Sequence, residues 1–167
     1  ANGKLVDGER WAATSTAAQP WSATAAPGGE TEAIAVQKIA PKPVDFAFPD
    51  STGKLVRLSD PRFHGKVVVV SLGGAWCPNC HEEAQFLGPY LTKNAGRGLE
   101  MIGLQFEYGD DQARACRQLD SFAKRYSLPY PLLLAGQPTA ESSAAALPFL
   151  PGGVKIYPTT LFIDRKG

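Results

Sequence analysis

The sequence predicts an α/β fold in which helices cover a mainly parallel sheet. Short apolar runs alternate with segments in which apolar residues recur at helical spacing, as in βαβ units. One run, at 66–72, is apolar on both faces, which is typical of a strand in the middle of a sheet. The composition, 44% hydrophobic and 20% charged, suits a packed core.

Two elements flank this run. Residues 46–48 and 55–57 enclose a turn-rich stretch, Pro49-Asp50-Ser51-Thr52-Gly53, and predict a β-hairpin. After the run, a helix is expected from Cys77 to about 94–96, because apolar residues recur at helical spacing as far as Leu91.

The later elements continue the alternation. Strands are expected at 99–106, 131–134 and 159–163, and helices at 110–126 and 139–147. The core face of the first of these helices should consist of Ala113, Leu119, Phe122 and Ala123.

The first forty residues differ in composition from the rest. Residues 12–36 are mostly Ala, Ser, Thr, Pro and Gly, with Glu30 and Glu32 their only charges. We expect 1–40 to be a low-complexity arm or linker, with one short strand at 31–39. Trp11 and Trp21 leave two alternatives open: docking on the main domain, or a remnant of a preceding domain. The main domain is expected at 41–167.

Charge and hydropathy exclude several classes of function. Seventeen Lys and Arg against sixteen Asp and Glu give a net charge of +1, which offers no field for binding nucleic acid. No unbroken apolar stretch is longer than 67–70, whereas a membrane span needs about 20 residues. No basic segment precedes an apolar one at the N-terminus, so we expect no signal peptide within this sequence.

The chemistry centres on Cys77-Pro78-Asn79-Cys80, which follows the central strand and opens the next helix. A thiol in a first helical turn lies near unpaired N–H groups and the positive end of the helix dipole, and both favour the reactive thiolate. Pro78 suits this turn because its φ is already near the helical value and it has no N–H to leave unpaired.

Other interpretations of the two cysteines are weaker. A zinc site would need further ligands from Cys116, His64 and His81, and none of these repeats the spacing. A purely structural disulfide would close too short a loop to stabilise the fold much. A redox-active dithiol is therefore the preferred interpretation, with no metal and no separate cofactor.

Two segments carry a family resemblance. They are Gly65-Lys66-Val67-Val68-Val69-Val70 with Ala75-Trp76-Cys77-Pro78-Asn79-Cys80, and Tyr157-Pro158-Thr159-Thr160-Leu161-Phe162-Ile163-Asp164. Over about 41–167 the chain resembles the TlpA/ResA group of thioredoxin-like disulfide oxidoreductases, of the redoxin or AhpC-TSA type. The resemblance implies a thioredoxin-like fold with a central mixed sheet, an N-terminal β-hairpin and an inserted strand and helix between 99 and 134. It also implies a further strand and helix after the turn at 164–167, which we expect to be missing here.

The resemblance assigns catalytic roles to three residues. It implies that Cys77 is the exposed nucleophile, that Cys80 is the resolving thiol, and that Glu83, on the same helical face as Cys80, helps to deprotonate it. A solvated surface carboxylate is the plainer alternative for Glu83.

The resemblance also implies a substrate-binding surface. Pro158 matches a cis-proline, which would turn the backbone of Tyr157 towards a substrate strand. Trp76 would line one side of the site. The remaining residues expected to contact substrate are Pro78, Asn79 and Thr159.

Some positions depart from related proteins. Ser71 stands where thioredoxin has a buried aspartate, so any carboxylate relay must come from Glu83. Gly73-Gly74 replaces bulkier residues, which predicts a looser backbone or an opened pocket. His81 is expected to be a surface residue of little effect, although its charge could favour a thiolate. Cys116 is expected to be a spare thiol without a role.

The sequence thus predicts an enzyme that reduces protein disulfides through Cys77 and Cys80. The alternative is a redox-competent domain that acts mainly as a protein-interaction module. A peroxiredoxin is disfavoured because Gly74 and Val70 occupy the positions of its threonine and proline. By resemblance, the partners would be protein dithiols and disulfides and a membrane-embedded electron donor, and the location would be periplasmic or membrane-anchored in a bacterium.

Overall fold

The structure, a computed structural model, describes residues 44–167. The expected arm at 1–40 and its short strand at 31–39 lie outside the described residues. The element order is β1 (Ala47–Pro49), β2 (Leu55–Arg57), the 3₁₀ turn η1 (Pro61–Phe63), β3 (Val67–Gly73), α1 (Pro78–Lys93), β4 (Leu99–Phe106), α2 (Gln112–Tyr126), β5 (Leu132–Gly136), α3 (Ala140–Ala146) and β6 (Thr159–Ile163).

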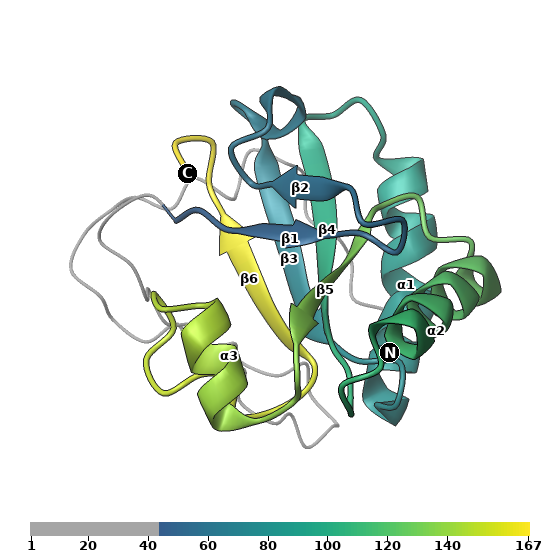
Figure 1. Cartoon of the computed structure of the whole chain (residues 1–167). Coiled ribbons are helices and arrows are strands. Elements are labelled where there is room, and N and C mark those ends of the chain that lie inside the picture. Colours follow the sequence, from purple (N-terminus) through teal and green to yellow (C-terminus); the bar gives the residue numbers. More distant parts are fainter. Residues whose placement is uncertain (1–43) are drawn as a thin grey trace, which may run out of the picture. The chain divides into compact units, whose positions relative to one another are not determined.

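Four strands form the central sheet, in the order β5-β4-β3-β6 (Figure 1). The strands β3, β4 and β5 are parallel, and β6 runs antiparallel to β3, so the sheet is mixed. Val70, in the middle of β3, pairs with Ile102 on one side and Leu161 on the other, and it is fully buried. The run that is apolar on both faces is therefore a central strand, as predicted.

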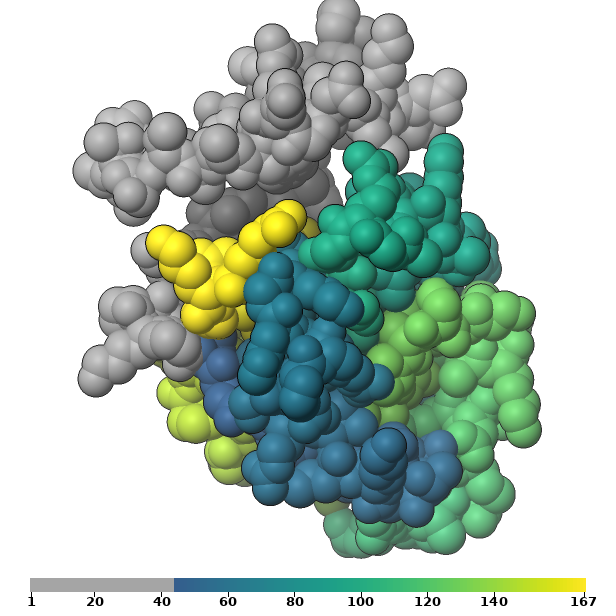
Figure 2. All heavy atoms as spheres, turned by 90° about the horizontal axis from the view of Figure 1, so that it is seen from above, coloured from purple at the N-terminus to yellow at the C-terminus, as the bar shows by residue number. Residues whose placement is uncertain are grey.

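The two faces of the sheet bury separate clusters of side chains. The hairpin β1–β2 and α3 lie over one face, where Phe46, Val56 and Leu147 pack against Val70 and Leu104. In Figure 2 the blue hairpin and the segment after it occupy the middle of this view, between the yellow C-terminal residues and the green segment that follows β4.

The helices α1 and α2 cover the opposite face. Ala84 and Leu91 of α1 and Leu119 and Phe122 of α2 pack there around Met101 of β4. None of the helices in the described part of the chain is long and apolar enough to cross a membrane.

The predicted strands and helices are confirmed to within a few residues. The strands β4 and β6 have the predicted bounds, whereas α2 begins at Gln112 rather than at 110, because Asp111 caps it by accepting a hydrogen bond from the Arg114 backbone N–H at 2.9 Å. The expectation for Ala113 is wrong. It is exposed, and Ala115 is buried in its place, since Ala115 lies nearer to the direction of Leu119 and Phe122 around the helix.

Candidate redox site

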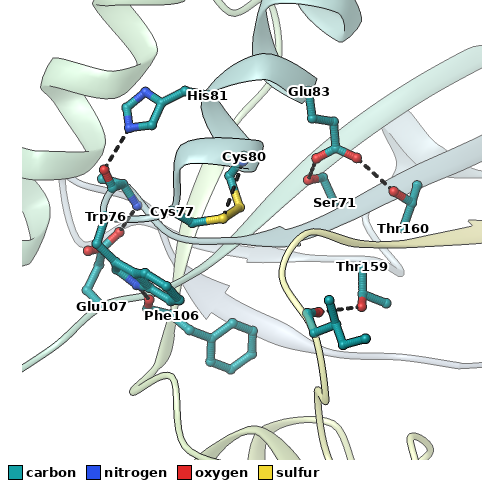
Figure 3. The surroundings of a disulfide bond; sticks show 12 residues. Ser71, Trp76, Cys77, Cys80, His81, Glu83, Phe106, Glu107, Thr159 and Thr160 are labelled. Atoms are coloured by element: carbon teal, nitrogen blue, oxygen red, sulfur yellow. Dashed lines mark hydrogen bonds between the residues drawn. A yellow bond between two sulfur atoms is a disulfide. The ribbon is translucent and has the colours of Figure 1, made fainter.

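A disulfide joins Cys77 and Cys80 where β3 ends and α1 begins (Figure 3). Cys77 is the N-cap of α1, and its sulfur accepts a hydrogen bond from the Cys80 backbone N–H at 3.3 Å. Pro78 starts the helix between the two cysteines and holds their Cα atoms 5.2 Å apart. The predicted position of the CxxC pair, at the carboxyl end of a central parallel strand, is confirmed.

Both cysteines are buried, so the expectation of an exposed Cys77 is wrong for this oxidised form. Cys77 is 3% exposed and Cys80 is 4% exposed, while Pro78 and Asn79 between them are exposed. In this form the Cys77 sulfur is bonded to the Cys80 sulfur and accepts the Cys80 backbone N–H.

Gly73 and Gly74, directly before the site, allow neighbouring side chains to pack closely against the backbone. A Cβ atom on Gly73 would lie 3.2 Å from the Cys80 sulfur. A Cβ atom on Gly74 would lie 2.7 Å from the Phe106 carbonyl oxygen and would overlap the Trp76 indole. The space beside both glycines is therefore filled by the Cys80 sulfur and the Trp76 indole, so the alternative of an opened pocket at these positions is wrong.

Aromatic rings gather beside the disulfide. The Trp76 indole N–H donates to the Phe106 carbonyl at 2.8 Å, and the Trp76 ring centroid lies 5.0 Å from that of Tyr108 and 5.5 Å from that of Tyr157. Trp76 thus connects the end of β4 with the segment before β6.

The peptide bond between Tyr157 and Pro158 is cis, as the resemblance implied. Burial, together with nearby Tyr108, raises the pKa of Tyr157 to about 12. Its buried hydroxyl has no hydrogen-bond partner within the described part of the chain. Thr159, at the start of β6, instead donates to the Ile156 carbonyl at 2.7 Å.

Glu83 lies one helical turn after Cys80 and links three elements. Its carboxylate accepts hydrogen bonds from Ser71 of β3 at 2.5 Å and from Thr160 of β6 at 2.8 Å (Figure 3). Its charge also contributes, after burial, to raising the pKa of Tyr130. Ser71, found in place of a buried aspartate, thus holds the carboxylate that α1 supplies, and the alternative of a free surface residue is wrong for Glu83.

Glu107 is a residue of the site that the sequence analysis missed. It is 2% exposed and follows β4, and its Oε1 accepts the Ala75 backbone N–H at 2.6 Å, while Oε2 has no partner within 44–167. Burial raises the pKa of Glu107 above its ordinary 4.5, against the opposing effects of the Ala75 hydrogen bond and the Arg114 charge. The available signal was a carboxylate directly after a fully buried strand, at the edge where α/β sheets place their sites.

His81 is not the plain surface residue expected. It is half-buried, and its ring nitrogens lie 2.9 Å from the Ala75 carbonyl oxygen and 2.7 Å from the Tyr126 hydroxyl. Ala75 is therefore held from two sides, by Glu107 through its N–H and by His81 through its carbonyl. Tertiary contacts fix the loop that leads into Cys77.

The other zinc-ligand candidates do not gather at the cysteines. No group of three or more His, Cys, Asp or Glu side chains that could hold a metal ion occurs among the described residues. His64 lies 2.8 Å from the Ser59 carbonyl oxygen, and Cys116 is a free, half-buried thiol of α2.

Comparison with known proteins gives a consistent assignment. The family model of the AhpC/TSA family matches residues 36–167. The thiol:disulfide interchange protein DsbE of Pseudomonas aeruginosa is 30% identical over 122 residues, which are 73% of this chain and 58% of that protein. DsbE of Haemophilus influenzae is 31% identical over 103 residues, covering 62% and 48%. The chain thus spans about half the length of these curated relatives.

Solved structures share the fold. A thiol:disulfide interchange protein of the thioredoxin family from Chlorobium tepidum superposes with a TM-score of 0.60 at 23% identity, covering 79% of this chain and 83% of that one. A secreted disulfide oxidoreductase from Mycobacterium tuberculosis gives 0.56 at 19% identity, covering 73% and 78%. The thioredoxin-like fold implied by the resemblance is therefore confirmed. Because the family model spans most of its length, the chain belongs to the AhpC/TSA family.

Proposed function

We propose that this chain is a thiol-disulfide oxidoreductase that reduces protein disulfides through Cys77 and Cys80. The observation that carries the proposal is the disulfide at the N-terminus of α1, next to the Trp76 and Tyr157 rings. The relatives named as thiol:disulfide interchange proteins support the same chemistry.

The first step begins from the reduced dithiol. The Cys77 thiolate attacks one sulfur of a partner disulfide, which forms the intermolecular S–S bond and breaks the partner's own. The partner's other sulfur leaves as a thiolate and takes up a proton. The helix N-terminus favours the attacking thiolate, because Cys77 is its N-cap.

The second step releases the partner. The Cys80 sulfur loses its proton and attacks the Cys77 sulfur, which forms the intramolecular disulfide and expels the partner's second thiolate. Two electrons have then passed to the partner. We assign Glu83 to this deprotonation, since it lies one turn after Cys80 and Ser71 and Thr160 orient its carboxylate. A dithiol donor must afterwards reduce the Cys77–Cys80 disulfide again.

Substrate contact is assigned to the surface around the disulfide. Pro78 and Asn79 are exposed between the cysteines, and Trp76 and Tyr157 flank them. The Tyr157 ring, packed against Trp76, would add an apolar contact to this surface. Pro158 and Thr159 complete this surface, where the backbone at the cis bond would pair with an extended substrate segment.

The wider setting follows from the resemblance. We assign the activity to residues 41–167 and a linker role to 1–40, in keeping with the start of the family match at residue 36. The protein would act outside the cytoplasm of a bacterium, anchored or periplasmic, and would receive electrons from a membrane-embedded donor.

The test is a trapping experiment with Cys80→Ser. Removing the resolving thiol should leave Cys77 joined to partner proteins as mixed disulfides, which a thiol reductant releases. Cys77→Ser should trap none, and Cys116→Ser should behave like the wild type. The reduced wild type should also reduce the disulfides of insulin. The proposal fails if Cys80→Ser gives no thiol-reversible adduct and the wild type leaves insulin intact.

A further inference from the structure

A groove of about 330 Å³ lies between α2 and the loop that leads into the disulfide. Its wall carries Arg114, Arg117 and Arg125 of α2, and Ala75 and His81 border it on the side of the redox site. We propose that this basic groove binds an acidic segment of the protein whose disulfide Cys77 attacks. The proposal rests on the proposed function and adds the chemical class of the partner.

The sequence of α2 explains why cations gather there. Residues 114, 117, 121 and 125 follow one another at helical spacing, so they share one side of the helix, while Leu119 and Phe122 face the core. This side is exposed. It contributes the three arginines together with Gln118 and Ser121, and no Asp or Glu of residues 44–167 lines the groove.

Within the described part of the chain, no carboxylate neutralises the guanidinium groups. Among residues 44–167 the one ion pair joins Lys66 to Glu100, so no described carboxylate lies within ion-pair distance of the three arginines. Arg125 lies over the Tyr126 ring, 5.6 Å from its centroid, and keeps its charge available. Arg114 differs from the other two, because its charge acts on the buried carboxylate of Glu107.

The inner border of the groove is fixed. Both ring nitrogens of His81 are engaged, with Ala75 and Tyr126, and its ring packs 4.8 Å from that of Phe122. Ala75 comes two residues before Cys77, so a ligand in the groove would lie beside the reactive loop. A prearranged border of this kind favours binding without rearrangement of the site.

Size and charge together define the ligand. The helix rises about 16 Å between Arg114 and Arg125, a distance that about five residues of an extended peptide would span. Guanidinium groups pair with carboxylates through two parallel hydrogen bonds, and the anionic groups that proteins commonly carry are Asp and Glu. The best fit is therefore a short run of acidic residues next to the partner's cysteine.

The experiment compares two disulfide-containing peptides that differ only in the residues beside one cysteine, three Glu in one and three Gln in the other. The second-order rate constant for oxidation of the fully reduced protein is measured with each peptide. At low salt the Glu peptide should react about tenfold faster, and added salt should reduce this preference.

Arg117→Glu/Arg125→Glu should abolish or invert the preference and leave the rate with the Gln peptide within about twofold of wild type. Arg114 is kept because of its effect on Glu107. Lys54→Glu/Lys93→Glu makes the same change in net charge at exposed positions outside the groove, and it should retain the preference.

Equal wild-type rates with the two peptides would overturn the groove proposal while leaving the proposed function intact. An equal loss of preference in the two double variants would also overturn it, because the effect would then come from net charge. A wild type that reduces neither peptide would overturn the proposed function and this proposal with it.

Discussion

At the scale of single residues, Glu107 gives the site a pH dependence. Burial raises the pKa of Glu107, so the folded state holds this proton more tightly than the unfolded chain does. From about pH 4.5 upward, through the raised pKa, the contribution of Glu107 to the free energy of unfolding should therefore fall as pH increases. Glu107→Gln removes this contribution but keeps an oxygen acceptor for Ala75.

The free energy of unfolding of Glu107→Gln should consequently rise relative to that of the wild type as pH increases from 4 to 7. Urea unfolding at several pH values, with both proteins oxidised, measures the difference. Parallel curves for the two proteins across this range would show that Glu107 does not titrate differently in the folded state.

Gly74 is a second single residue at which a substitution should affect the stability of the fold. Gly74→Ala would bring a Cβ atom within 2.7 Å of the Phe106 carbonyl oxygen and into the Trp76 indole. We expect a loss of about 1–3 kcal/mol in the free energy of unfolding, because neither neighbour can withdraw without losing its hydrogen bond.

Gln85→Ala is the control. Gln85 is exposed inside α1, and alanine is favoured inside a helix. Chemical denaturation of both variants should show a loss for Gly74→Ala alone. Equal stabilities would mean that the Trp76 contact tolerates rearrangement.

At the scale of elements, Glu83 joins α1 to β3 and β6. Glu83→Gln should slow the resolving step by about 100-fold, because the Cys80 thiol would lose its proton acceptor. The expected observation is a longer-lived mixed disulfide with a substrate peptide, followed in acid-quenched and alkylated samples. Glu82→Gln, an exposed neighbour on the same helix, is the control. Equal lifetimes in the two variants would remove Glu83 from the mechanism.

The elements were predictable where a local pattern determines them. The bounds of β4 and β6 follow from their apolar runs, and the start of α1 follows from Cys77 and Pro78. The hydrogen bonds around the cysteines could not be predicted from local patterns, because they join residues that are far apart in the sequence. Glu107 and Ala75 are 32 residues apart in the sequence, and His81 and Tyr126 are 45 residues apart.

At the scale of the whole molecule, the domain assignment is open to a direct test. A chain that starts at residue 41 should keep the thermal midpoint of the full chain within about 2 °C and reduce insulin at a similar rate, because the described residues 44–167 bury a core cluster on each face of the sheet. Thermal unfolding and the insulin assay measure both properties. A markedly lower midpoint would assign residues 1–40 a structural role and would contradict a linker.

The double attachment of Ala75 has a consequence for hydrogen exchange. The Ala75 amide proton is held by a buried carboxylate, so it should exchange with solvent only when the loop before Cys77 opens. Its exchange rate in the oxidised and reduced protein would give the free energy of that opening in each redox state. One backbone amide thus reports how far the segment carrying the disulfide loosens as the protein passes through its catalytic cycle.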